Sequence, residues 1–259
     1  MADPLAELRD AILAASADAS SPLVHLDVNR EIRTGVPEIV QAAGKDPATL
    51  LMIVQTLLDE RGRAIISRVR PTVLRTLKEH FVDYRVDEHP RARMAVVKRP
   101  DFLPQATGGR AGIVTAGTSD APFAEQAQVM LEEMGCATSM IYDVGVAGLH
   151  RLVQPLHRLL EDQVDVIIVA AGMDGALPSV VAGLVDVPVI GLPTSTAYGF
   201  GGRGVSALLS MLQTCVPGLT VVNVDNGVGA GASAALIANR IAAARNETES
   251  GNGQSPSAA

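Results

Sequence analysis

Five short apolar runs, each followed by a stretch long enough for one helix, organise the chain from Arg110 onward. The runs begin roughly twenty to thirty residues apart, a spacing typical of the βαβ units that build a parallel sheet. Because the runs are apolar at both alternating positions, they indicate strands that helices cover on two faces. The predicted strands are residues 111–115, 139–142, 166–169, 187–190 and 219–222. The pattern predicts an α/β fold, a three-layer αβα sandwich around a parallel sheet.

The pattern before Arg110 is different. Residues 5–15 and 47–59 have helical spacing, and residues 85–99 are dense in charge with short extended pieces. We therefore expect a small α or α+β N-terminal domain over residues 1–105, with the Pro- and Gly-containing residues 100–109 as the linker. The larger domain would span residues 110–245. Residues 246–259 are small and polar, so a disordered tail is expected there.

Composition narrows the function classes. Of 259 residues, 47% are hydrophobic and only 3% aromatic, which suits alanine-rich helices packed on a parallel sheet. The net charge is −7 with the two signs interspersed, so there is no extended basic face for nucleic acid. The first residues lack the basic and apolar segments typical of a signal peptide, and the sequence has no apolar run of about eighteen residues. We expect a soluble, cytoplasmic protein that binds neither nucleic acid nor a membrane.

The two cysteines, Cys136 and Cys215, are expected to be free thiols, since cytosolic proteins keep thiols reduced. Neither they nor the five histidines have the spacing of a zinc site. We assign Cys136 to packing. Cys215 follows an apolar helix that Pro217-Gly218 ends, and the negative end of a helix dipole disfavours a thiolate. From the residues alone, packing is the favoured role for Cys215 as well.

A polar loop containing glycine follows each predicted strand. Ligands of open parallel sheets bind outside the carboxyl ends of the strands, so these loops predict the rim of a binding site. In the first loop, Thr118 or Ser119 could be an ordinary helix cap, or the loop could bind a phosphate; both remain open. The loops are residues 116–122, 143–148, 171–175, 193–199 and 223–229.

Two nucleotide-binding motifs bear on the function. Gly229-x-Gly231-x-x-Ala234 resembles the dinucleotide fingerprint. It follows the last strand, however, and the acid expected about twenty residues later would fall in the predicted tail. The phosphate-binding loop motif of the nucleoside triphosphatases does not occur in the sequence. The motifs therefore do not support a nicotinamide dehydrogenase or a triphosphatase.

Several motifs together resemble the LarB family. They are Gly117-Thr118-Ser119-Asp120, the run from Tyr142 to Arg151, the run from Gly175 to Val181, Pro193-Thr194-Ser195 and the run from Val222 to Gly227. Upstream, Asp27-x-x-Arg30-x-x-Arg33-x-Gly35-x-Pro37-Glu38 resembles the same family. The second half is also similar to the PurE-like carboxylating mutase of purine biosynthesis, whose Ser-Asp loop binds phosphate.

The resemblance implies an enzyme that carboxylates C5 of the pyridinium ring of nicotinic acid adenine dinucleotide and cleaves its phosphoanhydride. The products would be AMP and pyridinium-3,5-biscarboxylic acid mononucleotide, a precursor of the nickel-pincer cofactor of lactate racemase. It implies carbon dioxide or bicarbonate as co-substrate, Mg²⁺ as the metal, and a homo-oligomer, an octamer in the relatives. It implies no nickel, zinc or organic cofactor in the enzyme itself.

The resemblance also gives roles to residues. Cys215 stands where relatives use a cysteine that adds covalently to the ring. Candidates for the general base are Asp120, Asp174 and His150, and Asp174 could instead hold Mg²⁺. The family usually has glutamate at Asp174 and glycine at Ala197. The expected substrate-binding residues are Gly117, Thr118, Ser119, Gly172, Gly175, Thr194, Ser195, Tyr198, Gly199, Asp225, Asn226, Gly227, Arg30 and Arg33.

Several of these residues could instead have ordinary structural roles. His150 could be a local hydrogen-bonding residue, Arg30 and Arg33 surface charges, Tyr198 a packing residue, and Asp225-Asn226-Gly227 an ordinary turn. Two other functions are also open: a mutase that acts on an aminoimidazole ribonucleotide, and a nucleotide-binding module without catalysis. The mutase requires neither Cys215 nor a domain before Arg110.

Overall fold

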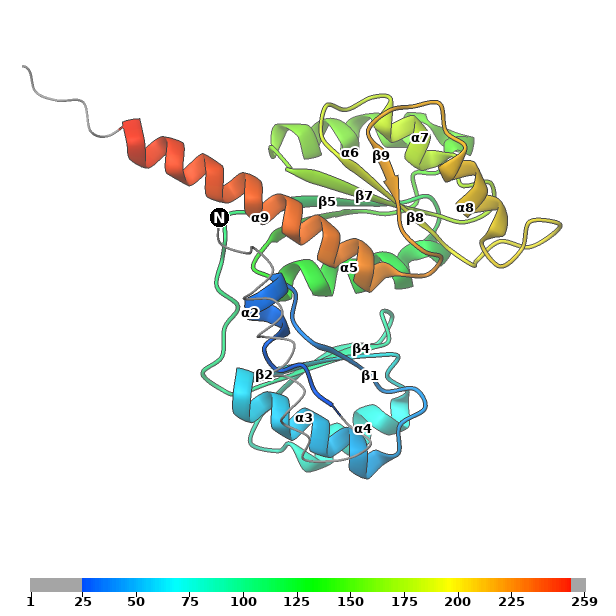
Figure 1. The fold of residues 1–259 in the computed structure, drawn as a ribbon. Coiled ribbons are helices and arrows are strands. Elements are labelled where there is room, and N and C mark those ends of the chain that lie inside the picture. Colours follow the sequence, from blue (N-terminus) through cyan, green and yellow to red (C-terminus); the bar gives the residue numbers. More distant parts are fainter. Residues whose placement is uncertain (1–24, 253–259) are drawn as a thin grey trace, which may run out of the picture.

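The computed structural model describes residues 25–252, so the predicted helix over residues 5–15 lies outside the described residues. Two sheets and three sets of helices stack as five layers (Figure 1). Helices α3 and α4 cover the outer face of the N-terminal sheet, and α5 and α9 lie between the two sheets. Helices α6, α7 and α8 cover the far face of the second sheet.

The N-terminal sheet has the strand order β1-β2-β4-β3, with β1 and β2 parallel and the other pairs antiparallel. It combines with three described helices, so the α+β alternative holds for this segment. The strands are β1 (Ile39–Gln41), β2 (Arg63–Ser67), β3 (Arg85–His89) and β4 (Met94–Lys98); the helices are α2 (Arg30–Thr34), α3 (Pro47–Arg61) and α4 (Pro71–His80).

Helix α3 confirms the helix predicted from residue 47, and its ends follow from local chemistry. The Asp46 carboxylate accepts a hydrogen bond from the Thr49 amide at 3.0 Å, and Pro47 occupies the first turn, where no N–H is needed. Gly62 ends the helix in the left-handed region with φ 74°. The chain then enters β2 directly.

Alternation along β2 and β4 explains why this sheet is covered on both faces. Ala64 and Ile66 point to the core that α3 and α4 form, whereas Ile65 points to α5 and α9. On β4, Val97 and Val96 divide between the two cores in the same way. Because successive side chains of a strand point to opposite faces, an unbroken apolar run requires two cores.

The second sheet confirms the predicted parallel architecture. Its order is β6-β5-β7-β8-β9 with every pair parallel. Each predicted strand is present, and no helix or strand lies between Lys98 and Arg110, where the linker was predicted. The strands are β5 (Arg110–Thr115), β6 (Ala137–Ile141), β7 (Val166–Ala171), β8 (Val189–Pro193) and β9 (Leu219–Val221); the helices are α5 (Ala121–Glu133), α6 (His150–Glu161), α7 (Leu177–Ala182), α8 (Val205–Leu212) and α9 (Gly227–Asn252).

The predicted disordered tail is partly wrong. Helix α9 continues through Asn252, so residues 246–252 are helical, while residues 253–259 lie outside the described residues. Arg245 anchors this part of the helix through an ion pair with Asp165 at 2.9 Å. Once a helix is formed and anchored, each further residue adds a hydrogen bond at little cost, so polar composition alone does not end it.

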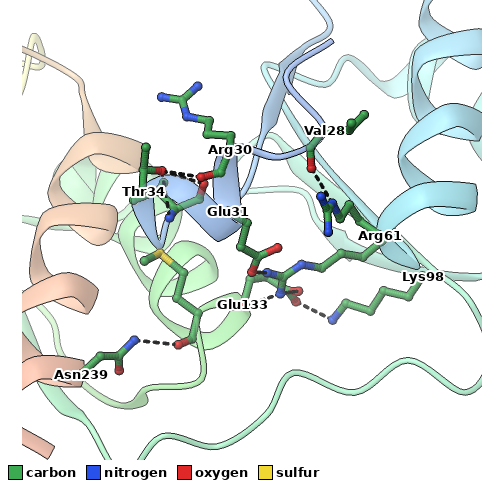
Figure 2. A network of polar contacts seen from close by, with 11 residues as sticks. Val28, Arg30, Glu31, Thr34, Arg61, Lys98, Glu133 and Asn239 are labelled. Carbon is green, nitrogen blue, oxygen red and sulfur yellow. Dashed lines mark hydrogen bonds and ion pairs between the residues drawn. The ribbon is translucent and has the colours of Figure 1, made fainter. Parts of the chain in front are cut away.

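A buried ion cluster joins the N-terminal sheet to α5. Glu133, at the end of α5, binds Lys98 and Arg63, and all three side chains are about 5% exposed. Arg63 also binds Glu31 at 2.5 Å, and Lys98 binds Asp87 at 3.0 Å. Figure 2 shows Lys98 paired with Glu133, and Glu31 of α2 close by. These ion pairs link the N-terminal sheet to α5, a helix of the second domain.

None of the helices within residues 25–252 has the length and apolar character needed to cross a membrane.

Candidate active site

Asp120 is the centre of the polar rim at the carboxyl edge of the second sheet. It is 3% exposed, and its Oδ2 accepts a hydrogen bond from the Gly117 amide at 2.8 Å. Its Oδ1 accepts hydrogen bonds from the hydroxyls of Thr194 at 2.6 Å and Thr196 at 3.0 Å. The carboxylate thus ties the loop after β5 to the loop after β8. With both oxygens occupied, it is suited to bracing the rim rather than to removing a proton.

Gly172 brings the loop after β7 against this centre. A Cβ at Gly172 would lie 2.2 Å from the Thr196 hydroxyl and 2.9 Å from that of Thr194. In the same loop Gly175 has φ 63°, and a Cβ there would lie 2.6 Å from the Ala207 carbonyl oxygen. Both glycines are therefore required by close approach, as expected where backbone passes near another segment.

Asp225, Asn226 and Gly227 brace the last loop. The Asp225 carboxylate accepts the Ser195 amide at 2.7 Å, and Asn226 Oδ1 accepts the Gly229 amide at 2.9 Å at the start of α9. A Cβ on Gly227 would lie 2.1 Å from the Phe123 carbonyl oxygen, so glycine allows α9 to approach α5. Gly231 serves the same contact, with its Cβ position 2.5 Å from the Ala127 oxygen. Of the two fingerprint-like glycines, Gly231 therefore serves helix packing, whereas a Cβ on Gly229 would lie 2.3 Å from the Asn226 side chain.

Thr118 and Ser119 carry the exposed polar groups of the first loop. Neither hydroxyl has a hydrogen-bond partner within residues 25–252, and Asp120 caps the Gly117 amide instead. The ordinary helix-cap interpretation of Thr118 and Ser119 is therefore wrong. Both hydroxyls are free to contact a ligand at the start of α5, where the helix dipole favours an anion.

Three further predicted residues lie exposed on the rim loops. Asp174 follows β7, the middle strand of the sheet, and no hydrogen bond or ion pair joins its carboxylate to another described residue. His150 begins α6 and is likewise exposed. Tyr198 is 80% exposed beside Gly199, on the loop before α8 that reaches away from the body in Figure 1.

Cys215 does not lie on this rim. Helix α8 runs back along the sheet from the loop after β8, and the Cys215 thiol is exposed shortly before β9 begins at Leu219. The Gly218 oxygen accepts the amide of Val189, the first residue of β8, so this segment lies at the amino edge. At about 3.3 Å a residue, the length of β8 places the two edges about 15 Å apart. Within one chain, the structure does not bring Cys215 to the candidate site.

Arg30 and Arg33 also lie away from the rim. Arg30 pairs with Glu38 at 3.1 Å and Arg33 with Asp27 at 2.5 Å. The Arg33 hydrogen bond, with the nearby arginine charges, lowers the pKa of Asp27. Their helix α2 adjoins the Glu133 cluster through Glu31, at the far end of α5 from Thr118 (Figure 2). Both guanidinium groups are satisfied by neighbouring acids rather than turned toward the loops.

Cys136 is buried, and its thiol lies 3.0 Å from Asn239 Oδ1, which agrees with the packing role. Burial raises the pKa of this thiol to about 11. The thiol is therefore protonated at neutral pH and is not a nucleophile.

Two features of the rim are not among the residues predicted from the sequence. Thr196 completes the Asp120 centre, and the alternation Thr194-Ser195-Thr196 was the available signal, because residues two apart share a side of an extended segment. Asp143, in the left-handed region at φ 58°, holds Arg151 at 2.8 Å. Asp143 and Arg151 belong to one of the motifs that resemble the LarB family, but their pairing follows only from the fold.

A metal could be held at the rim only with help from a ligand. No group of three or more His, Cys, Asp or Glu side chains that could bind a metal occurs among the described residues. Asp174 offers one exposed carboxylate, and a single carboxylate with phosphate oxygens and water suits Mg²⁺. The donor set therefore fits Mg²⁺ brought in with a phosphorylated substrate.

Comparisons with known proteins place both domains. The family described as AIR carboxylase matches residues 110–252, and the family described as LarB/PurE-like N-terminal domain matches residues 18–99. An uncharacterized protein of Methanocaldococcus jannaschii is 44% identical over 216 residues, covering 82% of this chain and 83% of its own.

Two further relatives match about half of the chain. An N5-carboxyaminoimidazole ribonucleotide mutase of M. jannaschii is 35% identical, covering 52% of this chain and 80% of its own. A solved PurE2 variant from Treponema denticola has 20% identity and a TM-score of 0.40, covering 58% of this chain and 94% of that one. With the AIR carboxylase match spanning more than half its length and the LarB/PurE-like domain ahead of it, the chain belongs to the AIR carboxylase family and has the LarB-like architecture.

Proposed function

We propose that this protein carboxylates C5 of the pyridinium ring of nicotinic acid adenine dinucleotide and hydrolyses the phosphoanhydride, releasing AMP and pyridinium-3,5-biscarboxylic acid mononucleotide. The observation that carries the proposal is the exposed Cys215 thiol in a chain that has a LarB/PurE-like N-terminal domain. An exposed free thiol is available to a ligand, unlike the buried Cys136.

The chemistry needs a nucleophile that both starts and ends the reaction. A pyridinium ring is electron-poor and does not attack carbon dioxide. Addition of the Cys215 thiolate at C4 forms a carbon–sulfur bond and leaves C5 as an enamine carbon, which can attack carbon dioxide. A base then takes the C5 proton, the carbon–sulfur bond breaks, and the thiolate departs as the ring regains aromaticity. The cationic ring also stabilises the thiolate before addition.

We assign the removal of the C5 proton to Asp174. The oxygens of Asp120 already accept three hydrogen bonds, whereas Asp174 is exposed and unpaired among the described residues, on the loop after the middle strand. In the hydrolysis of the phosphoanhydride, the same carboxylate would hold Mg²⁺, which neutralises charge on the phosphate oxygens. Thr118 and Ser119 would bind phosphate with their free hydroxyls.

The geometry adds a requirement: Cys215 must enter the rim of a second copy of the chain. The outer side of α8 exposes Val205, Leu209 and Leu212 by 54%, 59% and 63%, a stripe at helical spacing that leads toward Cys215. Burying this stripe against another copy would move Cys215 into the interface with it. The proposed enzyme is therefore a homo-oligomer with shared sites.

Mixing two inactive variants tests this arrangement. Cys215→Ala and Asp174→Asn should each release no AMP from the dinucleotide with bicarbonate and Mg²⁺. Co-expressed in one assembly, they should recover about a quarter of the wild-type rate, because that fraction of sites combines an intact Cys215 with an intact Asp174. Recovery should be absent when both changes are in one chain. If the wild-type protein is active but no mixture of the two variants recovers activity, one chain supplies the whole site.

The second candidate is a mutase acting on N5-carboxyaminoimidazole ribonucleotide, favoured by the match of residues 110–252 to the AIR carboxylase family and by relatives named as that mutase. The same preparation should be offered both substrates. Turnover of the ribonucleotide that survives Cys215→Ala, with no reaction of the dinucleotide, would replace the proposed function by this one.

A further inference from the structure

The N-terminal sheet has one edge where most cations have no partner within residues 25–252. Three segments meet there, because β1 and β2 end at this edge and β4 begins at it: residues 42–46, 67–71 and 89–93. Backbone hydrogen bonds join them, from the Ala42 amide to the Ser67 oxygen at 2.9 Å and from the Val69 amide to the Arg93 oxygen at 2.8 Å. The segments carry five cationic residues, which we call the arginine edge: Lys45, Arg68, Arg70, Arg91 and Arg93.

Most of these cations have no acidic partner among the described residues. The side chains of Lys45, Arg68, Arg70 and Arg93 are exposed, and none has a hydrogen bond or ion pair to another described residue. Arg91 alone is paired, with Glu125 at 2.9 Å. The one acid in the three segments, Asp46, accepts the Thr49 amide at 3.0 Å. In a chain of net charge −7, a group of unpaired arginines is a local excess.

At the opposite edge of the same sheet, arginine and lysine side chains pair with acids. There Arg63 binds Glu31 at 2.5 Å, and Lys98 binds Asp87 at 3.0 Å. Arg85 also binds Asp87, at 3.1 Å. Lys98 and Arg85 hold the pKa of Asp87 below its usual range although burial acts to raise it. Among residues 25–252, the sheet therefore pairs its cations at one edge and leaves four of the five at the other edge without a partner.

Backbone conformation supports a role for the side chains at the arginine edge. Arg68 and Arg93 have φ values of 54° and 53°, in the left-handed region where glycine or asparagine is favoured. Arginine gains nothing from the backbone at either position. Residues held in this region are concentrated at functional sites, which suggests that the guanidinium groups are needed.

The arginine edge faces the same side of the molecule as the candidate active site. The Ala92 carbonyl oxygen accepts a hydrogen bond from the Gln126 side chain at 3.0 Å, and Arg91 binds Glu125. Both partners lie near the start of α5, which follows directly after Thr118–Asp120. At 1.5 Å a residue, Gln126 lies about 8 Å along α5 from Ala121, so these contacts bring the segment before β4 near the end of α5 that begins at the rim.

We propose that the arginine edge binds the phosphate groups of a nucleotide that reaches from the N-terminal domain to the rim. Guanidinium groups match phosphate oxygens in paired geometry, and neighbouring strands about 4.8 Å apart bring the segments close enough to share one pyrophosphate. The net negative charge of the chain disfavours a nucleic acid as the ligand. The proposal deepens the proposed function and rests on it only in naming a nucleotide.

Calorimetric titration of the full chain with inorganic pyrophosphate tests the site without turnover. The variant R68G/R93G removes two guanidinium groups while suiting the left-handed backbone, so its thermal midpoint should not fall below that of wild type. Its affinity for pyrophosphate should fall at least about tenfold. The matched control R75A removes an exposed arginine of α4 outside the cluster and should keep the affinity. Wild-type binding should also weaken with added salt.

Equal affinity in R68G/R93G and wild type, or no binding by wild type, would overturn the proposal. Duplex DNA that binds wild type, fails to bind R68G/R93G and resists competition by pyrophosphate would replace the nucleotide with nucleic acid. The proposed function fails separately: a protein inactive on the dinucleotide whose pyrophosphate binding still depends on Arg68 and Arg93 would keep this inference. If both hold, R68G/R93G should raise KM for the dinucleotide more than it lowers kcat.

Discussion

The Glu133 cluster offers the sharpest test of how the two domains are joined. One carboxylate serves Arg63 and Lys98, and all three side chains are about 5% exposed. Changing Glu133 to Gln keeps the shape and one acceptor oxygen but removes the charge. Two buried cations then share Glu31 and Asp87, which are only partly buried, as their remaining acids.

The expected cost follows from burial. Breaking a buried ion pair by removing one partner costs about 3–5 kcal/mol, because the remaining charge is left uncompensated. With Glu31 and Asp87 still present, we expect about 3 kcal/mol for E133Q. For a domain pair of this size that lowers the thermal midpoint by roughly 6–12 °C.

The assay is urea or thermal unfolding of the full chain, with E88Q as the matched control. Glu88 pairs with Lys78 at 2.5 Å, but those side chains are 35% and 53% exposed, and exposed pairs contribute less than about 1 kcal/mol. Replacing Lys98 with Met in the E133Q background should recover part of the loss, because it removes one stranded charge. Equal unfolding free energies for E133Q and E88Q would refute the reasoning.

Four other outcomes are expected. Asp120→Asn should lower the unfolding free energy by about 2–3 kcal/mol in denaturant titrations, with the surface change D162N as the control. The substitution replaces one carboxylate oxygen with an amide nitrogen, which cannot accept the hydrogen bonds that this oxygen accepts. Gly172→Ala should cost about 1–3 kcal/mol and slow turnover, since its Cβ would lie 2.2 Å from the Thr196 hydroxyl; unchanged stability would mean the rim yields freely. Iodoacetamide should alkylate Cys215 and spare Cys136, as mapped by peptide mass. Burial raises the pKa of the Cys136 thiol from 9.0 to about 11, so the unfolded chain loses this proton at lower pH than the folded chain. The free energy of unfolding should therefore fall as pH rises from about 9 to 11. This part of the pH dependence should be absent in C136A.

The second sheet could be predicted from the sequence because its strands are buried on both faces and separated by single helices. Val166–Ala171 shows the signal most clearly, with every residue buried. The N-terminal sheet was harder to predict. β3 reads Arg-Val-Asp-Glu-His, and β1 has three residues, so neither has a usable periodicity. Arg63 begins β2 and Lys98 ends β4, and charged residues at these positions do not indicate buried strands. Their partner Glu133 lies far along the chain.

The loops of the site were predictable, but the arrangement of their side chains was not. Parallel topology alone puts the loops after β5, β7 and β8 at one edge. The same topology should have placed Cys215 at the other edge, because a helix that follows a parallel strand returns the chain to the amino ends before the next strand begins. The hydrogen bonds from Thr194 and Thr196 to Asp120 connect segments more than seventy residues apart, so no local pattern reveals them.

The central claim is that the Cys215 sulfur activates the pyridinium ring for capture of carbon. Its most direct test is the mass of the product formed from nicotinic acid adenine dinucleotide with isotopically labelled bicarbonate, using wild type, C136A and C215A. The account predicts a mononucleotide carrying one labelled carboxyl group from wild type and C136A, and none from C215A. Label incorporation by C215A at the wild-type rate would contradict it.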